Sequence, residues 1–469
     1  MRVKHIVLLL PFLWFSASAQ EVLSVQEFLD QLAKNHPVMA QADARVGQSE
    51  ADIRYAKGAF DPNFTFDNQV KTLDGKNYFR YETPELSWQS PFGLKLKAGQ
   101  EYSAGSYINP EKTKGQLQYL GMELPLLQGL LTDYKRTALK QAKIYKQQSE
   151  TDRQSILNDL MFSGLQAYNN WALTHKLLNI LETYRANSYE RQRLVKMGFE
   201  NGYYAAADTI EALSQRQNID LLYSQTNLDF QKASFALAQF LWDEEQTPYI
   251  PDENLLPENL QTATVLPEYE IYELIELAKN NHPDIRAYTL KTAYYEAYRK
   301  LQFQKILPTA NLKFNYLSPN YAGFVATNPG LQNNYKLGFT VRIPLLFREG
   351  RGALEKAQLK LTETDWATKQ KIWEVETKVR NYHNAYEQLK GQSRMAQDMQ
   401  ENYRALLNNE VFKFKQGESS LFYVNTRENK WLDSQQKLLQ TQLKLFNALY
   451  QQEWAAGILL NRVTLNQTP

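Results

Sequence analysis

The chain has 469 residues, of which 53 are basic and 51 acidic, and a formal net charge of +2. This balance argues against the strongly basic surface of a nucleic-acid-binding protein. The absence of cysteine excludes disulfide bonds, thiolate metal sites and a lipid-modified N-terminal cysteine. Aromatic residues make up 13% of the chain, and transmembrane β-barrels use such residues at both membrane interfaces.

The first twenty residues have the order of features of a secretory signal peptide. A basic start is followed by the apolar run 6–15 and by the small-residue triplet 17–19. The apolar run is about half of the roughly 20 residues that a membrane-spanning helix needs. We therefore expect a signal peptide at 1–19, cleaved after Ala19, and an exported chain. No later run of about 20 apolar residues follows, so a chain of this kind that spans a membrane does so as a closed β-barrel.

Two copies of one pattern fill the rest of the chain. The segment 32–37 (LAKNHP) recurs at 277–283 (LAKNNHP), and its His-Pro pair moves by 246 residues, from 36 to 282. The segment 125–127 (PLL) recurs at 344–346, a shift of 219, so the first copy has 27 more residues before this point (246 minus 219). Such self-similarity indicates two tandem structural repeats. We place them at 20–242 and 269–460, joined by a proline-rich linker at 243–268 and followed by a tail at 461–469.

Each copy contains a strand-like region. Residues 335–343 alternate apolar and polar side chains over nine positions, close to the roughly 9–11 residues of a tilted membrane-spanning strand. Residues 312–316 alternate likewise, which predicts a β-hairpin at 308–344 with a long loop. The equivalent region of the first copy is 62–125. Alternation alone does not decide whether the apolar face meets lipid or a second sheet.

Very long helices follow the strands. The segments 133–197 and 353–416 contain no proline and are rich in Gln, Lys, Glu, Leu and Ala. About 65 residues at a rise of 1.5 Å make a helix of about 100 Å, and we expect each to turn near a glycine and return as a helical hairpin, at 132–242 and 353–460. Apolar residues at spacings of three and four predict a packed stripe, formed by Leu157, Leu160, Gly164, Ala167 and Trp171.

Two copies of helix, strands and long helical hairpin resemble the TolC family of outer-membrane efflux proteins. Three local signals carry the resemblance: the strand-to-helix passages with Pro125, Gly129, Pro344 and Gly350; the strand entry Ala59-Phe60-Asp61-Pro62; and the helix turn in which Asp208 follows Gly202 by six residues. The resemblance implies an α+β membrane protein. Its expected form is a homotrimer with a 12-stranded transmembrane β-barrel, four strands per chain, continuous with a long periplasmic α-helical barrel. The 27 additional residues leave an extra hairpin in the first repeat open.

The resemblance also implies partners and a place in the cell. The chain would lie in the outer membrane of a Gram-negative cell, with its helices in the periplasm. It would conduct small molecules passively from an inner-membrane RND or ABC transporter, through a periplasmic adaptor, to the outside. The adaptor would dock at the two helix turns, on Met197, Gly198, Phe199, Gly202, Gln416, Gly417 and Glu418. Exit of a protein in type I secretion is the nearest alternative, and an exported coiled-coil scaffold without a channel is another.

A ring of three Asp208 carboxylates in a trimer would favour cations at the periplasmic entrance. The alternative is that Asp208 faces a neighbouring helix. The second turn lacks the acidic residues that family members commonly have there, since Tyr423 and Thr426 occupy the corresponding positions. We predict no enzymatic activity, no cofactor and no metal site: the five histidines include no H-E-x-x-H motif, and His36 and His282 precede prolines at expected helix starts.

Overall fold

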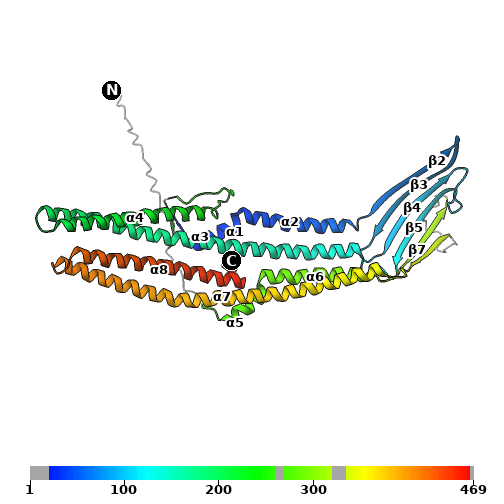
Figure 1. Ribbon diagram of the computed structural model, residues 1–469. Helices are drawn as coiled ribbons and strands as arrows, with labels where there is room; N and C mark the ends of the chain where they lie inside the picture. The colour runs from blue at the N-terminus through cyan, green and yellow to red at the C-terminus, as the bar shows by residue number, and fades with distance from the viewer. Residues whose placement is uncertain (1–20, 253, 259–267, 320–333, 465–469) are drawn as a thin grey trace, which may run out of the picture. The chain divides into compact units, whose positions relative to one another are not determined.

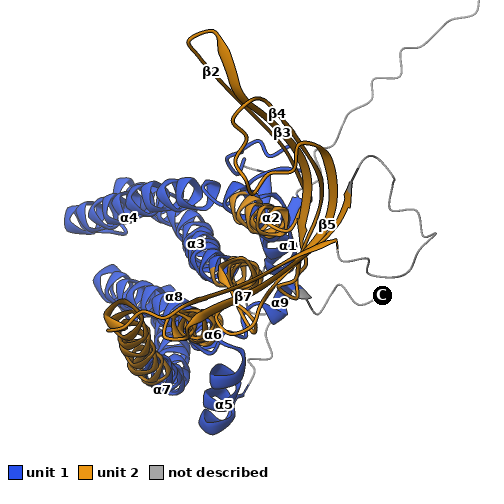
Figure 2. Cartoon of the chain, turned by 90° about the vertical axis from the view of Figure 1, so that its right-hand side faces the viewer, with its two compact units in different colours: residues 1–40, 156–282, 375–469 blue, residues 41–155, 283–374 orange. Residues whose placement is uncertain are grey.

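The computed structural model describes residues 21–252, 254–258, 268–319 and 334–464. The expected signal peptide, part of the linker and the loop of the second β-hairpin lie outside these residues. The chain divides into two compact units (Figure 2). Unit 1 contains Met1–Ala40, Ile156–His282 and Val375–Pro469, and unit 2 contains Gln41–Ser155 and Pro283–Glu374. These units differ from the two sequence repeats, because each unit contains segments of both repeats.

Two of the helices are much longer than the others. α3 has 67 residues and α7 has 68, and neither contains proline, which would interrupt the backbone hydrogen bonds. The helices are α1 (Val25–Asn35), α2 (Pro37–Gly58), α3 (Tyr134–Glu200), α4 (Ala206–Ala238), α5 (Ile271–Asn281), α6 (Pro283–Gln304), α7 (Arg348–Lys415), α8 (Leu421–Ala456) and α9 (Asn461–Thr464). Among the described residues, none of the helices combines the length and the apolar character needed to cross a bilayer.

Unit 1 is built on two helical hairpins, α3 with α4 and α7 with α8 (Figure 1). Its core combines residues of both hairpins with α1, and its largest fully buried side chains include Tyr168 and Trp171 of α3. The predicted stripe on α3 is therefore a packing stripe within one chain. Gly164 belongs to it because a Cβ there would lie 3.1 Å from the ring of Phe28, so glycine lets α1 approach α3 closely.

Short elements close the core of unit 1. A capping box starts α1: Ser24 Oγ accepts the N–H of Glu27 at 3.1 Å, and Glu27 accepts the N–H of Ser24 at 3.0 Å. The strands β1 (Glu21–Leu23) and β6 (Leu255–Pro257) pair in parallel. Tyr168 donates to the carbonyl of Leu23 at 2.6 Å, so the linker segment and the start of the described chain are both attached to α3.

Unit 2 contains one antiparallel sheet of six strands, in the order β2-β3-β4-β5-β7-β8. The strands are β2 (Asn63–Leu73), β3 (Lys76–Gln89), β4 (Lys95–Ala104), β5 (Gly115–Pro125), β7 (Thr309–Pro319) and β8 (Tyr335–Arg342). Figure 2 shows that the sheet is curved. β5 of the first repeat pairs with β7 of the second, so the two repeats form a single sheet.

The sheet has six strands, two more than the expected four, so the extra hairpin that the sequence left open is present. In each repeat the first strand follows a matching proline, Pro62 or Pro308, and the last ends at or before a second one, Pro125 or Pro344. β2 and β5 therefore correspond to β7 and β8, and β3 with β4 is the additional pair. Pro84 and Gly99 interrupt the strand-forming pattern of this pair in the sequence, because both residue types are depleted in strands.

Candidate functional sites: a two-faced sheet, the strand-to-helix passages and the helix turns

The six-stranded sheet has one apolar and one polar face. Successive side chains of a strand point to opposite faces, and the pairing register fixes which residues share a face. One face, called the apolar face below, carries Phe64, Leu86, Leu96, Leu120, Phe314 and Leu337. Most of these are exposed, Phe64 at 72%. These apolar residues form a band near the strand ends that adjoin the helices in the sequence, and beyond it the same face carries polar and charged residues such as Arg80 and Glu82. A band of exposed apolar side chains marks a surface that contacts lipid or another protein.

The opposite, polar face is held by contacts between strands. Glu123 on β5 lies 3.8 Å from the ammonium of Lys97 on β4 and 3.5 Å from that of Lys313 on β7. Tyr119 of β5 reaches across β4 and donates to Glu85 of β3 at 2.7 Å. The residue beneath it is Gly99, where a Cβ would lie 2.5 Å from the Tyr119 oxygen. The glycine thus leaves room for the tyrosine ring, and the contact joins β5 to the additional strands.

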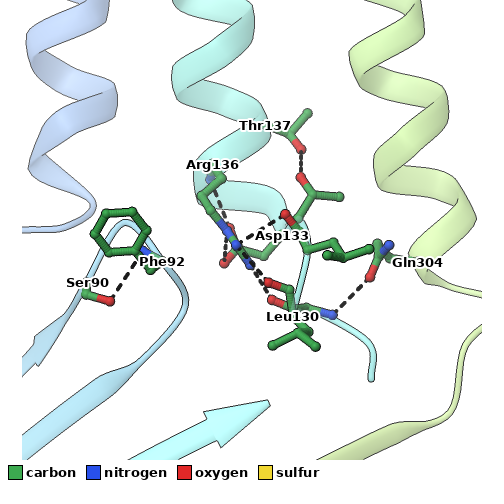
Figure 3. Close-up of polar contacts among 10 residues, drawn as sticks. Ser90, Phe92, Leu130, Asp133, Arg136, Thr137 and Gln304 are labelled. Carbon is green, nitrogen blue, oxygen red and sulfur yellow. Dashed lines mark hydrogen bonds and ion pairs between the residues drawn. The ribbon is translucent and has the colours of Figure 1, made fainter. Parts of the chain in front are cut away.

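In the first strand-to-helix passage, Arg136 holds the loop between β5 and α3 (Figure 3). Its guanidinium donates to the carbonyls of Gly129 and Leu130, the latter at 2.9 Å, and lies 3.2 Å from the carboxylate of Asp133. Asp133 also accepts the N–H of Arg136 at 2.8 Å, which caps the first turn of α3. Gly129 has φ +88°, a conformation that glycine adopts without strain.

The second strand-to-helix passage, between β8 and α7, differs from the first in which residue has a positive φ. Phe347, and not a glycine, has the positive φ of +49°, and α7 already begins at Arg348, earlier than the expected residue 353. Gly350 therefore lies in the first turn of a helix. A Cβ at Gly350 would be 2.6 Å from the carbonyl oxygen of Lys305, so this glycine permits close packing on the end of α6. Gly129 and Gly350 have equivalent sequence positions but different structural roles.

The two helix turns of unit 1 have the same backbone geometry. At the first, Gly202 has φ +80°, its N–H donates to Phe199 at 2.9 Å, and the N–H of Tyr203 donates to Gly198 at 2.8 Å. At the second, Gly417 has φ +79°, its N–H donates to Phe414 at 3.0 Å, and that of Glu418 to Lys413 at 3.0 Å. Both are Schellman motifs, in which a left-handed glycine ends the helix. The internal repeat thus extends to the turns.

Apolar side chains are exposed at both turns. Met197 is 46% exposed, Phe199 44% and Tyr203 82%. The second turn exposes Phe412 and Phe422. Tyr203, Phe412 and Phe422 were not among the predicted contact residues. All three lie within five residues of a helix-ending glycine, but so do Tyr204 and Phe414, which stack on each other; sequence position alone therefore does not separate the exposed aromatic residues from the packed ones.

Inside unit 1, Tyr204 connects the first turn to the second hairpin. Its ring stacks on Phe414 of α7, with centroids 6.3 Å apart and an interplanar angle of 10°. A Cβ at Gly198 would lie 2.4 Å from the Tyr204 ring, so this predicted contact residue is a packing site for Tyr204. Gly417 has open space around its Cα. Gly202 is equally open, so the two turns are alike at their helix-ending glycines.

Comparison with known proteins shows which family has this arrangement. The model of the outer membrane efflux protein family matches residues 274–456. These residues contain α6, β7, β8, α7 and α8, most of the second repeat. The second repeat is thus similar to the outer membrane efflux protein family. The predicted resemblance to TolC-like channels is confirmed. Among curated proteins, no sequence matches the chain.

Solved outer-membrane channels share the fold of this chain. The MtrE outer membrane channel of Neisseria gonorrhoeae, in its open state, has a TM-score of 0.66 and 16% identity over 94% of this chain and 90% of its own. The CmeC outer membrane channel of Campylobacter jejuni has a TM-score of 0.64 and 14% identity over 93% and 86%. The outer membrane protein VceC of Vibrio cholerae has a TM-score of 0.61 and 13% identity over 92% and 96%.

Asp208, the residue predicted for an entrance ring, caps its own helix. Its carboxylate accepts the N–H of Ala205 at 2.9 Å, at the start of α4, and a carboxylate in this position also stabilises the positive end of the helix dipole. The side chain is half-buried. The capping bond uses one carboxylate oxygen. The other oxygen has no role in that bond, and the entrance ring of Asp208 stays a prediction.

Close to the turns, a buried polar network joins the two hairpins of unit 1. Glu428 of α8 is 2% exposed and accepts two bonds from the Arg191 guanidinium of α3, at 2.7 and 2.8 Å. Gln215 of α4 donates to the same carboxylate at 3.0 Å, and Asn425 accepts from Arg191 at 3.0 Å. A bidentate pair with further hydrogen bonds is the arrangement in which a buried charge is best compensated.

The two histidines singled out in the sequence begin helices, as predicted: α2 starts directly after His36 and α6 directly after His282. Nδ1 of His36 accepts the N–H of Val38 at 3.2 Å, and its Nε2 lies 3.3 Å from the carbonyl of Gln239. Among the residues that the structure describes, no group of three or more His, Asp or Glu side chains is arranged to hold a metal ion.

Proposed function

We propose that this chain forms the outer-membrane exit duct of a tripartite efflux system and conducts small molecules passively. The observation that carries the proposal is the combination, in one chain, of a sheet with an exposed apolar band and two long helical hairpins that end in matching turns. The match of residues 274–456 to the outer membrane efflux protein family supports it. A lipid-facing sheet and an adaptor-facing pair of turns are the two surfaces that such a duct needs.

The sheet supports assembly in the outer membrane. A sheet can span a bilayer only when it closes, because an open edge leaves backbone groups without hydrogen bonds in lipid. In the described part of the chain, β2 and β8 are the edges of the sheet. Pairing of β8 with β2 of another copy satisfies both edges. A homotrimer closed in this way would expose the apolar faces to lipid and enclose the polar faces around a water-filled lumen.

The helix turns support docking of a periplasmic adaptor protein. Both turns combine a rigid Schellman backbone with exposed apolar side chains, Met197 and Phe199 at the first and Phe422 at the second. Aromatic residues and methionine are enriched in protein interfaces. The adaptor would connect the duct to an RND or ABC transporter in the inner membrane, after export of the chain by its signal peptide.

The proposal is tested by assembly, conductance and phenotype. The purified protein is expected to form a trimer in detergent and discrete ion channels in planar bilayers. Deletion of its gene is expected to sensitise the cell to dyes, detergents or antibiotics. Loss of a single secreted protein instead would assign the duct to type I secretion. A protein that is recovered from the soluble periplasm and gives no conductance would be a scaffold, and the channel proposal would fail.

A further inference from the structure

The additional strands lie inside the sheet. β3 and β4 are inserted between β2 and β5, the strands that correspond to β7 and β8 of the second repeat. β2 is paired with β3 along its whole length, β3 also pairs with β4, and β4 pairs in turn with β5. The insertion is therefore neither a loop nor a hairpin attached at one edge. Without it, β2 would have to pair directly with β5 to remain in the sheet.

The inserted pair continues the two-faced pattern of its neighbours. Leu86 and Leu96 lie on the apolar face, in line with Phe64 on one side and Leu120 on the other. On the polar face, the bond from Tyr119 to Glu85 crosses above Gly99. An inserted hairpin outside the membrane would have no reason to keep an exposed apolar row in register with the other strands. The pattern indicates that, within this apolar band, all six strands face the same two environments.

The edges of the sheet are suited to pair with further copies of the same chain. Every neighbouring pair in the six-stranded sheet is antiparallel, so the first strand, β2, and the last, β8, run in opposite directions. β8 of one copy can therefore continue the antiparallel order with β2 of the next. They have 11 and 8 residues, and exposed apolar edges of this kind associate readily with other strands.

We propose that three copies close through β8 and the next copy's β2, so that the membrane sheet has eighteen strands, three times six, and not twelve. The inference rests on the proposed trimeric duct. Because barrel diameter grows roughly linearly with strand number, the lumen would be about 1.5 times as wide as that of a twelve-stranded barrel, in the range where porins keep an open aqueous channel. The exit across the membrane would admit bulky solutes.

The strand order at the subunit boundary can be read by cross-linking, since the chain has no cysteine. One cysteine is placed on the polar face of β2, Thr65→Cys, and a second is moved along the polar face of β8, for example Thr340→Cys. Oxidation is expected to give covalent trimers in denaturing gels. The control moves the first cysteine to β4, Lys95→Cys, which should give none. Trimers only with the β4 cysteine would overturn the eighteen-stranded closure in favour of a twelve-stranded one.

The width of the exit is measured separately, with neutral polymers of graded size added to the sheet side of single channels in planar bilayers. A variant that lacks residues 76–104 loses β3 and β4, so that each repeat contributes two strands. The largest polymer that enters its channel is expected to be smaller than for the unmodified protein. An equal limit would overturn the wider lumen. If the variant does not assemble, the cross-linking result decides. If the unmodified protein forms neither trimers nor channels, the proposed function fails. If it forms trimeric channels whose subunits cross-link through β4 and not through β2, only the eighteen-stranded closure fails.

Discussion

At the scale of single residues, His36 caps α2 with a neutral ring. Its Nδ1 accepts a backbone N–H and its Nε2 donates to the Gln239 carbonyl, and only the neutral ring provides one acceptor and one donor. Burial lowers the pKa of His36, and the hydrogen bond to Gln239 opposes this effect. Burial also lowers the pKa of His175 on α3. Both groups therefore bind a proton less readily in the folded chain than in the unfolded one.

The sign of the resulting pH dependence follows from linkage. Below the unfolded histidine pKa of about 6.5 the unfolded chain binds more protons, so acid destabilises the fold. We expect the melting temperature of unit 1, followed by circular dichroism, to fall between pH 7.5 and 5.5. His36→Asn keeps a capping side chain without titrating and is expected to reduce this fall, and the double variant with His175→Gln to reduce it further. A pH dependence that is unchanged in both variants would contradict the assignment.

Glu428 is the residue whose loss is expected to cost most stability. Glu428→Gln leaves the buried Arg191 without its counter-charge, and breaking such a pair costs about 3–5 kcal/mol. The matched control is Glu401→Gln, an exposed glutamate on α7, expected within about 0.5 kcal/mol of wild type. Chemical denaturation of the helical unit measures both. The double variant Arg191→Met/Glu428→Leu removes both charges and is expected to recover most of the loss; equal destabilisation in all three variants would refute a charge-based role.

At the scale of elements, the turn after α7 is expected to control docking. Gly417→Pro cannot adopt φ +79° and lacks the N–H that donates to Phe414, so the turn must change. Such backbone strain costs about 1–3 kcal/mol, and we expect adaptor cross-linking at this turn to fall by about tenfold, the factor for 1.4 kcal/mol. Trimer assembly should persist. The control is Gly391→Ala in the middle of α7, where an added Cβ meets nothing within 4 Å. Undiminished cross-linking of the proline variant would place docking elsewhere.

The long elements could be predicted from the sequence because their signals extend over many residues. The helices α3 and α7, the strand β8 and both helix-ending glycines follow from periodicity, missing prolines and the internal repeat. The strand number could not be predicted. Pro84 and Gly99 conceal β3 and β4 in the sequence, and the reason for the glycine, the ring of Tyr119 above it, exists only after β3, β4 and β5 pair.

The candidate contact residues at the turns were also only partly predictable from the sequence. Gly202 and Gly417 are recognisable because a left-handed helix end requires glycine. The role of Gly198 is visible only in the folded chain, where Tyr204 lies against it. The capping bond of Asp208 is a local interaction between residues three apart, and the sequence pattern allowed it without distinguishing it from a carboxylate that faces the lumen. Contacts between residues distant in the chain were the part that sequence reasoning missed.

At the scale of the whole molecule, the polar face of the sheet predicts the charge of the exit. In a closed assembly this face lines the lumen, and rings of charged side chains bias which ions pass. Within the six strands, the residues on this face include six basic and four acidic side chains: Lys71, Lys95, Lys97, Lys313, Lys336 and Arg342, and Asp67, Glu85, Glu101 and Glu123. The excess of two positive charges per chain, six minus four, is repeated in every copy of the assembly.

We therefore expect a mild preference for anions, measured as the sign of the reversal potential of channels in a tenfold KCl gradient. Lys95→Glu with Lys336→Glu changes the balance from plus two to minus two and is expected to reverse the sign. Asp208→Asn is the matched test of the helical entrance, since asparagine keeps the oxygen that accepts the Ala205 N–H. If wild-type channels prefer cations and Asp208→Asn abolishes that preference, ion selection takes place at the entrance ring, and the charges of the sheet do not determine it.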